Sequence, residues 1–249
     1  MKFEPTKESI SQHKVPEWYD DAKFGIFIHW SLSSVPAFAP TVGQSLHELA
    51  EEDKGFSHSM KNSPYAEWYL NTMRIDGSPT QKHHEETFGS DYSYLNFQKT
   101  FEERNLKMDP NEWAEFFKEA GAKYVVLVTK HHDGYCLWPS EYKNPKYPEY
   151  QSTRDLVGEI TDAVRAKGMK MGLYYSGIFD WTFKDYPIDS IENWVKHQLV
   201  TDEYCEYATN HMLELIEKYK PSYSIRISSK NFGFENNIKS VPLYAVFCI

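Results

Sequence analysis

The sequence predicts an α/β protein built around a parallel β-sheet. Three observations support this prediction: a helix with an apolar stripe is followed by a strand in three successive rounds, the strands are rich in β-branched or aromatic residues, and the first two helices end at a glycine. Helices and strands that alternate in this way imply parallel strands joined by right-handed crossovers.

The first strand is predicted at residues 24–30, within the sequence KFGIFIHW. The segment from Ser31 to Met108 is long, polar and aromatic, and its pattern is not that of the helix–strand rounds. It is predicted to form loops and short helices over one end of the sheet.

Residues 109–121, DPNEWAEFFKEAG, show the start and stop signals of a helix. Asp109 is expected to cap it, Pro110 suits its first position and Gly121 can close it. Its apolar stripe at i, i+3, i+4 and i+7 consists of Trp113, Phe116, Phe117 and Ala120. The strand at residues 124–130 follows as a continuous apolar run, which is typical of strands buried on both faces.

The same pattern occurs twice more. A helix over 154–168 precedes a strand at 170–176, and a helix over 207–222 precedes a strand at 223–228. The last of these, with the sequence YSIRIS, is predicted to be the fourth strand of the same parallel sheet.

Polar and aromatic side chains occur where three of these strands end. His29 ends the first strand, His131, His132 and Asp133 follow the second, and Tyr174 lies near the end of the third. In parallel α/β proteins, ligands bind at the carboxyl ends of the strands. We therefore expect these side chains to meet at one edge of the sheet.

Several chemistries could use these residues. A metal is disfavoured because neighbouring strand residues face opposite ways, so His131 and His132 could share an ion only where the strand has broken, and no zinc-type spacing occurs. A serine nucleophile is disfavoured because YYSG is not a G-x-S-x-G elbow. Hydrogen-bonded core histidines explain each histidine taken alone.

A sugar site explains the set best. Neutral imidazoles, phenols and indoles can hydrogen-bond hydroxyls and stack on a pyranose ring. The sequence YAEWY adds Glu67 beside Trp68, although ordinary packing is the simpler explanation of Trp68 taken alone.

The composition restricts the partners and the compartment. Lys plus Arg total 27 against 36 for Asp plus Glu, a net charge of −9. Neither nucleic acid nor a membrane is expected as a partner, because phosphate binding uses clustered positive charge and no apolar run approaches the roughly 20 residues of a spanning helix. The first eleven residues lack the apolar core of a signal peptide. Three cysteines fit a reducing compartment, so a cytoplasmic location is predicted.

Five segments, in order across residues 16–222, resemble the α-L-fucosidases of glycoside hydrolase family 29. They are PEWYDDAKFGIFIHWSLSSVPAFAP, YAEWY, GAKYVVLVTKHHDGYCLWPS, RDLVGEITDAVRAKGMKMGLYYSGIFDW and EYATNHMLELIEKYKPS. The resemblance implies a (β/α)8-like catalytic barrel followed by a β-sandwich. It also implies removal of terminal L-fucose from glycans or glycosides with retention, without a metal or other cofactor. The fucose-binding residues that it implies are His29, Glu67, Trp68, His131, His132 and Tyr174.

The resemblance stops after residue 222. The family's nucleophile is an aspartate in a LWND-like motif shortly after YKP, and its acid/base lies further on. Here no aspartate follows Asp202, and Glu235 is the only acid after Glu217. We therefore assign no catalytic residue and expect this chain to be inactive alone.

The fold expected from this comparison is a partial (β/α)8 TIM-like barrel with about four parallel strands. Residues 1–222 are expected to form the N-terminal part of the catalytic barrel, and residues 223–249 a tail that departs from the family. A truncated or frame-shifted product explains this pattern, and a non-catalytic fucose-binding or regulatory protein is the alternative. The expected partners are a fucosylated glycan or glycoside and, at the open sheet edges, a second copy or a complementing C-terminal half.

Overall fold

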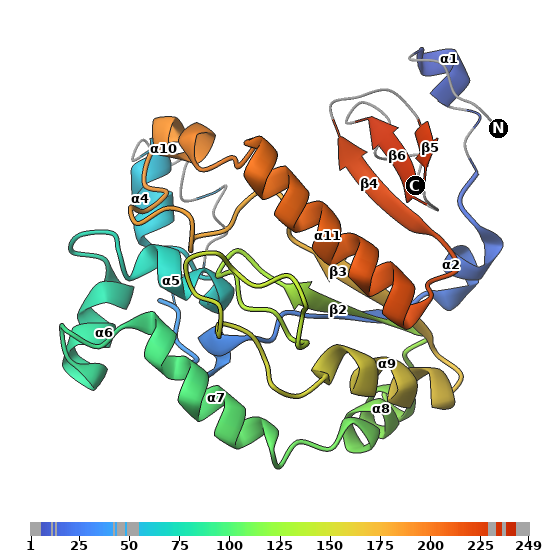
Figure 1. Cartoon of the computed structure of the whole chain (residues 1–249), viewed down its shortest axis with the longest axis horizontal. Coiled ribbons are helices and arrows are strands. Elements are labelled where there is room, and N and C mark those ends of the chain that lie inside the picture. The colour runs from blue at the N-terminus through green and yellow to red at the C-terminus, as the bar shows by residue number, and fades with distance from the viewer. Residues whose placement is uncertain are drawn as a thin grey trace.

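The computed structural model describes residues 6–10, 12, 14–41, 43, 48, 55–228, 233–235 and 238–242. Figure 1 shows a parallel sheet flanked by helices, with a smaller sheet beside it. The strands are β1 (Gly25–Ile28), β2 (Tyr124–Lys130), β3 (Lys170–Tyr175), β4 (Ser224–Ser228), β5 (Gly233–Glu235) and β6 (Ile238–Pro242). The α-helices of the first half are α1 (Lys7–Ile10), α2 (Glu17–Ala22), α4 (Gly55–Lys61), α5 (Tyr69–Thr72), α6 (Pro79–Phe88) and α7 (Phe97–Asn105). Those that follow are α8 (Pro110–Glu119), α9 (Leu156–Ala166), α10 (Ile191–Lys196) and α11 (Asp202–Tyr219). The short 3-10 helices are η1 (Leu32–Ser34), η2 (Ala66–Trp68) and η3 (Tyr94–Asn96).

The main sheet has the order β1-β2-β3, and both of its strand pairs are parallel. Gly25 lies opposite Tyr124, which in turn lies opposite Lys170, so the three strands start at the same level. The α/β class and the first three strands predicted from the sequence are therefore confirmed. The predicted short helices between β1 and β2 are also present, as α4 to α7 and the 3-10 helices between them.

Helices α8 and α9 cover one face of this sheet (Figure 1). Val125 and Leu127 of β2 are fully buried and share one core cluster with Leu156 and Ile160 of α9. The predicted stripe of α9 is thus its buried face. The predicted apolar stripe of α8 is only partly buried. Phe116 is 67% exposed, whereas the neighbouring Trp113 and Phe117 pack against the core.

The opposite face of the sheet is open. Phe27 of β1 is 52% exposed and Tyr174 of β3 is 42% exposed, and Val126 between them is half-buried. Aromatic side chains are thus exposed on this face at β1 and β3, whereas Val128 of β2, opposite Tyr174, is buried.

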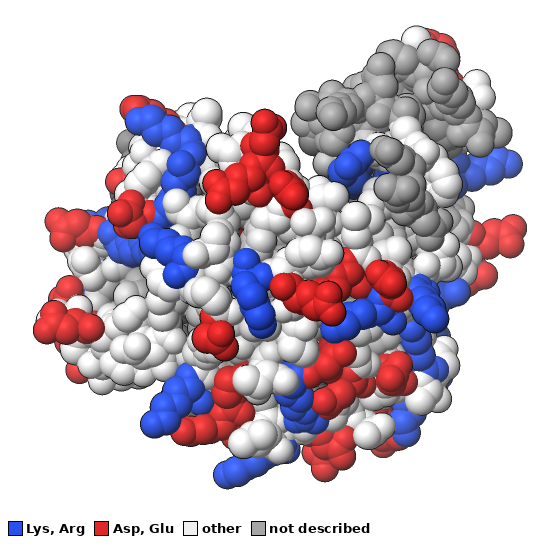
Figure 2. All heavy atoms as spheres, in the orientation of Figure 1, with Lys and Arg blue, Asp and Glu red and all other residues white. Residues whose placement is uncertain are grey.

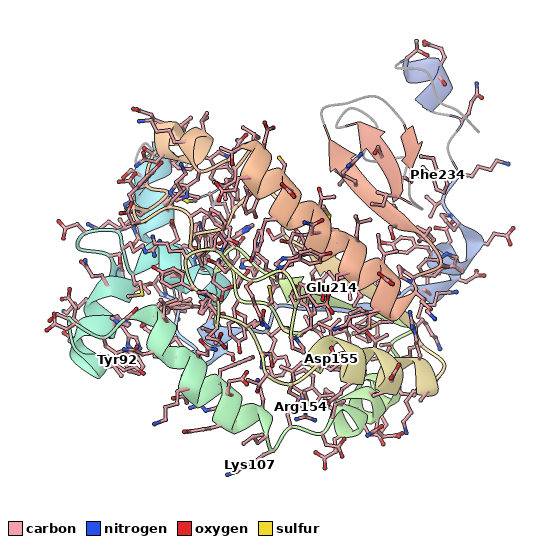
Figure 3. The ribbon with its side chains drawn as sticks, in the orientation of Figure 1. Tyr92, Lys107, Arg154, Asp155, Glu214 and Phe234 are labelled. Atoms are coloured by element: carbon pink, nitrogen blue, oxygen red, sulfur yellow. The ribbon has the colours of Figure 1, made fainter. Side chains whose placement is uncertain are left out.

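Helix α11 begins at Asp202, five residues before the predicted start, because Thr201 caps it by accepting a hydrogen bond from the Tyr204 backbone N–H. Its inner face also carries a buried carboxyl. Glu214, labelled in Figure 3, accepts hydrogen bonds from Trp138 Nε1 at 2.9 Å and Ser140 Oγ at 2.5 Å. These bonds fasten α11 to the segment that follows β2.

The prediction of a fourth strand in the main sheet is wrong. Residues 224–228 do form a strand, β4, but it pairs in parallel with β6, which also pairs antiparallel with β5. In Figure 1 this second sheet lies apart from β1–β3. Strands buried on both faces are continuously apolar, whereas β4 contains Arg226 and its Ile227 is half exposed. Most of the predicted tail after residue 228 lies outside the described residues.

Charged side chains of both signs are interspersed on the face shown in Figure 2. No helix in the described ranges is both long and apolar enough to span a membrane.

Candidate carbohydrate site at the carboxyl edge of the sheet

A register shift at the end of β2 decides which side chains reach the carboxyl edge. Val128 lies opposite Tyr174, but Lys130 lies opposite Tyr175, so one residue of β2 is unpaired between them. Irregularities of this type re-aim side chains next to functional sites. After the shift Lys130 faces the side of the sheet that Tyr175 faces, and β2 ends there.

The strand therefore breaks before the histidine pair, and both histidines turn toward the same place. The ring centroids of His131 and His132 lie 4.1 Å apart. His131 also makes an edge contact with His29, with ring centroids 5.2 Å apart. His29 stacks on Phe27, and Phe27 contacts Tyr174. Ring contacts thus connect the ends of all three strands.

The second half of the cluster comes from the segment between β1 and β2. Trp68 ends η2 and contacts His132, with ring centroids 5.5 Å apart. The half-buried Glu67 precedes it on the same turn. Two further indoles, Trp181 and Trp194, flank Trp68 at centroid distances of 5.2 and 6.0 Å. The sequence did not single out either of them, because Trp181 lies in a loop and Trp194 on α10, both away from the strand ends.

Asp133 holds the ends of β1 and β2 together. It is fully buried and accepts hydrogen bonds from the hydroxyls of Ser31 and Tyr94 and from the Tyr135 backbone N–H. Ser31 is two residues after His29, so this carboxyl fixes the segment that carries His29. Burial raises the pKa of Asp133, against the opposing effect of these hydrogen bonds.

The two histidines after β2 are held neutral. Burial lowers the pKa of His132 to about 3, with further contributions from the charges of Lys130 and His29. Burial also holds the pKa of His131 well below its usual value, and His132 and His29 add to the effect. Neutral imidazole has one N–H donor and one acceptor nitrogen, the pair of groups that a sugar hydroxyl needs. The Nδ1 atom of His131 is buried and has no hydrogen-bond partner within the described part of the chain.

Lys130, the residue immediately before the two histidines, belongs to a buried ion pair. Lys130 Nζ is 3.0 Å from Asp180 Oδ2, and both side chains are 0% exposed. Sequence reasoning missed this pair. A lysine that ends a buried strand was a usable signal, because such a charge needs a partner.

One described cavity lies elsewhere. It has a volume of about 300 Å³ and lies among the residues after α5, the segment before η3 and the loop 181–185. None of the six predicted binding residues lines it, although Trp181, whose ring contacts Trp68 and His132, forms part of its wall. We place the candidate site at the strand ends because the converging polar and aromatic groups are there.

The described residues contain no group of three or more His, Cys, Asp or Glu side chains placed to hold a metal ion. What the edge offers is neutral imidazoles, indoles and phenols. The carboxyl edge of a parallel sheet is where α/β proteins bind their ligands, and here it presents groups that can both stack and hydrogen-bond.

Comparisons with known proteins identify the family. A family profile described as Alpha-L-fucosidase matches residues 1–225. The chain is 42% identical to an alpha-L-fucosidase of Dictyostelium discoideum over 73% of its own length and 35% of that protein's. It is 32% identical to human tissue alpha-L-fucosidase over 88% of its length and 41% of the relative's. The chain therefore belongs to the α-L-fucosidase family, glycoside hydrolase family 29.

Solved structures of α-L-fucosidases are also similar to this chain. The Thermotoga maritima alpha-fucosidase in complex with fucose is 37% identical, with a TM-score of 0.72 over 98% of this chain and 51% of that one. The chain thus spans about half the length of this solved relative and about two fifths or less of the two curated relatives above.

Proposed function

We propose that this chain recognises the terminal L-fucose of glycans or glycosides. The residues proposed to bind it are His29, Glu67, Trp68, His131, His132 and Tyr174. The observation that carries the proposal is the unbroken series of ring contacts from Tyr174 to Trp68 across three strand ends, in a chain of this family.

Four of these residues have a chemical role suited to a sugar. Trp68 offers an aromatic face to the C–H groups of the sugar, and the neutral rings of His131 and His132 can exchange hydrogen bonds with its hydroxyls. Glu67 accepts hydrogen bonds as a carboxylate. A sugar bound in this way needs no charge of its own.

The parallel sheet is proposed to be part of a (β/α)8-like barrel. Its β1-β2-β3 order, its helices on one face and its open aromatic face support this arrangement. In this proposal residues 1–222 belong to the catalytic barrel and residues 223–249 depart from it. A complementing C-terminal half or a second copy of the chain would cover the open face.

Retaining hydrolysis is the reaction of the family, and we propose that residues 1–249 alone do not perform it. That reaction uses two carboxyl groups about 5–5.5 Å apart. Asp133 is engaged by two hydroxyls, and Asp180 is paired with Lys130. Among the six residues proposed to bind the sugar, Glu67 is the one carboxylate, and one carboxylate cannot act as both nucleophile and acid.

An NMR titration tests recognition. Methyl α-L-fucoside added to the ¹⁵N-labelled chain should shift the resonances of the six proposed residues, and methyl α-D-mannoside should not. His29→Ala and Trp68→Ala should each weaken binding about tenfold, whereas Tyr147→Ala in the separate cavity should leave it unchanged. Shifts confined to the cavity would reject the proposed site.

An aryl α-L-fucoside tests the lack of hydrolysis. Purified 1–249 should release nitrophenol at the background rate. Release well above background that a single Glu67→Gln change abolishes would contradict the proposal. A non-catalytic fucose-binding protein remains the alternative to a piece of an enzyme, and hydrolysis restored by an added C-terminal half would favour the latter.

A further inference from the structure

His132 is held at both its ring and its backbone. Its Nδ1 lies 2.7 Å from Ser176 Oγ, and its backbone oxygen accepts a hydrogen bond from the Trp181 N–H at 2.7 Å. Throughout the described ranges no hydrogen bond reaches the other ring nitrogen, Nε2. The ring is therefore oriented by Ser176 and keeps Nε2 for a ligand.

Ser176 itself is fixed by Lys130. The serine is 2% exposed, its backbone N–H donates to the Lys130 oxygen at 3.0 Å, and its own backbone oxygen accepts from Lys130 Nζ at 3.3 Å. Three hydrogen bonds at one buried residue leave its hydroxyl little freedom.

The buried ion pair anchors both contacts to His132. Lys130 Nζ is 3.0 Å from Asp180, with the Tyr175 ring 4.9 Å away. Asp180 immediately precedes Trp181, whose N–H binds the His132 oxygen. One ion pair therefore places the groups that bind the ring and the backbone of His132.

The direction of the Ser176–His132 hydrogen bond follows from what the hydroxyl can reach. A buried O–H without an acceptor is costly, and the described residues offer this hydroxyl the Nδ1 atom of His132 as its hydrogen-bonding partner. If the hydroxyl donates, Nδ1 is unprotonated, and the neutral ring carries its proton on Nε2. The low pKa of His132, about 3, keeps the ring neutral near pH 7, so its tautomer decides what it offers.

We propose that Ser176, held by Lys130 and Asp180, is a positioning residue that fixes His132 as the Nε2–H tautomer, so that His132 donates a hydrogen bond to a ligand oxygen. The sugar ligand rests on the function proposed above. The tautomer does not, because it is a property of the free protein.

Long-range ¹H–¹⁵N correlation spectra of the histidine rings test the tautomer directly. With His132 assigned through the His132→Asn variant, the free wild-type chain should show the Nε2–H pattern from pH 5 to 8. Ser176→Ala should convert it to a mixture of the two tautomers, and Ser222→Ala, an exposed serine, should leave it unchanged. Ser176→Thr, which keeps the hydroxyl, should preserve the wild-type pattern.

An Nδ1–H pattern in the wild type, or an unchanged pattern in Ser176→Ala, would overturn the proposal. If Ser176→Thr does not fold, Ser176→Ala alone decides, because it removes a single oxygen. A titration with methyl α-L-fucoside then separates the two claims. Affinity about three- to tenfold weaker in Ser176→Ala supports the donor role, and unchanged affinity rejects it. Absence of fucoside binding by the wild type would reject the proposed function while the tautomer result stands.

Discussion

Removing the carboxylate from the buried ion pair should strongly destabilise the chain. In Asp180→Asn the Lys130 ammonium keeps its position but loses the negative charge 3.0 Å away, at a site with no solvent exposure. Breaking a buried pair by removing one partner costs about 3–5 kcal/mol, because the other charge stays buried without compensation. Domains are stable by only about 5–15 kcal/mol, so this loss is a large part of the total.

Urea unfolding followed by tryptophan fluorescence and circular dichroism measures this loss. Lys130→Met alone should be destabilising to a similar degree, and the double variant should cost much less than the two single changes added together. Glu86→Gln, which breaks the exposed pair with Lys82, is the control and should change nothing measurable. A cost below about 1 kcal/mol for Asp180→Asn, or single costs that simply add, would refute the reasoning.

The pH dependence of the same pair has a defined sign. Burial lowers the pKa of Lys130, but Asp180 and the nearby tyrosines outweigh it, so the pKa is raised well above 10.5. The stabilisation should therefore be complete below about pH 10.5 and be lost as the pH rises through the higher folded-state pKa.

Three further outcomes are expected. Gly134→Ala should lower the free energy of unfolding by about 2–4 kcal/mol, because φ is +80° there and the new Cβ would lie 2.5 Å from Asp180 Oδ1. Gly121→Ala is the control and should cost less, because no atom lies within 4 Å of its new Cβ. Equal losses for the two variants in urea unfolding would contradict this. The free energy of unfolding should fall as the pH drops from 6.5 toward 3, because His132 takes up a proton in the unfolded chain but not in the folded one, where its pKa is about 3. The raised pKa of Asp133 has the opposite effect on stability, but only at the acid end of this range. A thermal unfolding temperature that does not change between pH 6.5 and 5 would contradict the prediction. The contribution of His132 to fucoside affinity should be constant from pH 5 to 8, since its ring stays neutral, and an affinity change centred near pH 6.5 that disappears in His132→Asn would exclude this.

Helices and strands whose apolar residues recur at a regular spacing could be predicted from the sequence. The helices at 110–119 and 156–166 and the three parallel strands follow from apolar spacing and capping residues. The strand ends also indicated four of the six candidate residues, His29, His131, His132 and Tyr174, because parallel strands place their last residues at one edge, whereas Glu67 and Trp68 came from the YAEWY segment. Both histidines were expected at that edge, but the register shift just before them was not predicted, since it adds one residue that strict alternation does not anticipate.

The failures share a physical cause, which is contact between segments far apart in the chain. YSIRIS has the pattern of a strand, but its sequence does not say whether β3 or β6 pairs with it. The sequence does not show that Lys130 and Asp180 form an ion pair, because they are far apart in the chain and meet only in the folded protein. Trp181 lies in a loop without periodicity, so its place beside His132 depends on the folded path of that loop.

The Ser31–Asp133 hydrogen bond has a consequence for the order of folding. It joins residues 102 apart in sequence, whereas Ser176 and His132 are 44 apart. Closing the loop between Ser31 and Asp133 costs about 0.7 kcal/mol more in chain entropy than closing the loop between His132 and Ser176. This figure does not include the cost of ordering the helices within the longer loop. We expect the β2–α9–β3 unit to assemble first and β1 to dock late, which leaves one edge of β2 unpaired during folding. In pulsed hydrogen exchange the amides of β3 should gain protection before those of β1, and simultaneous protection would indicate that the long segment between β1 and β2 is already compact in the unfolded chain.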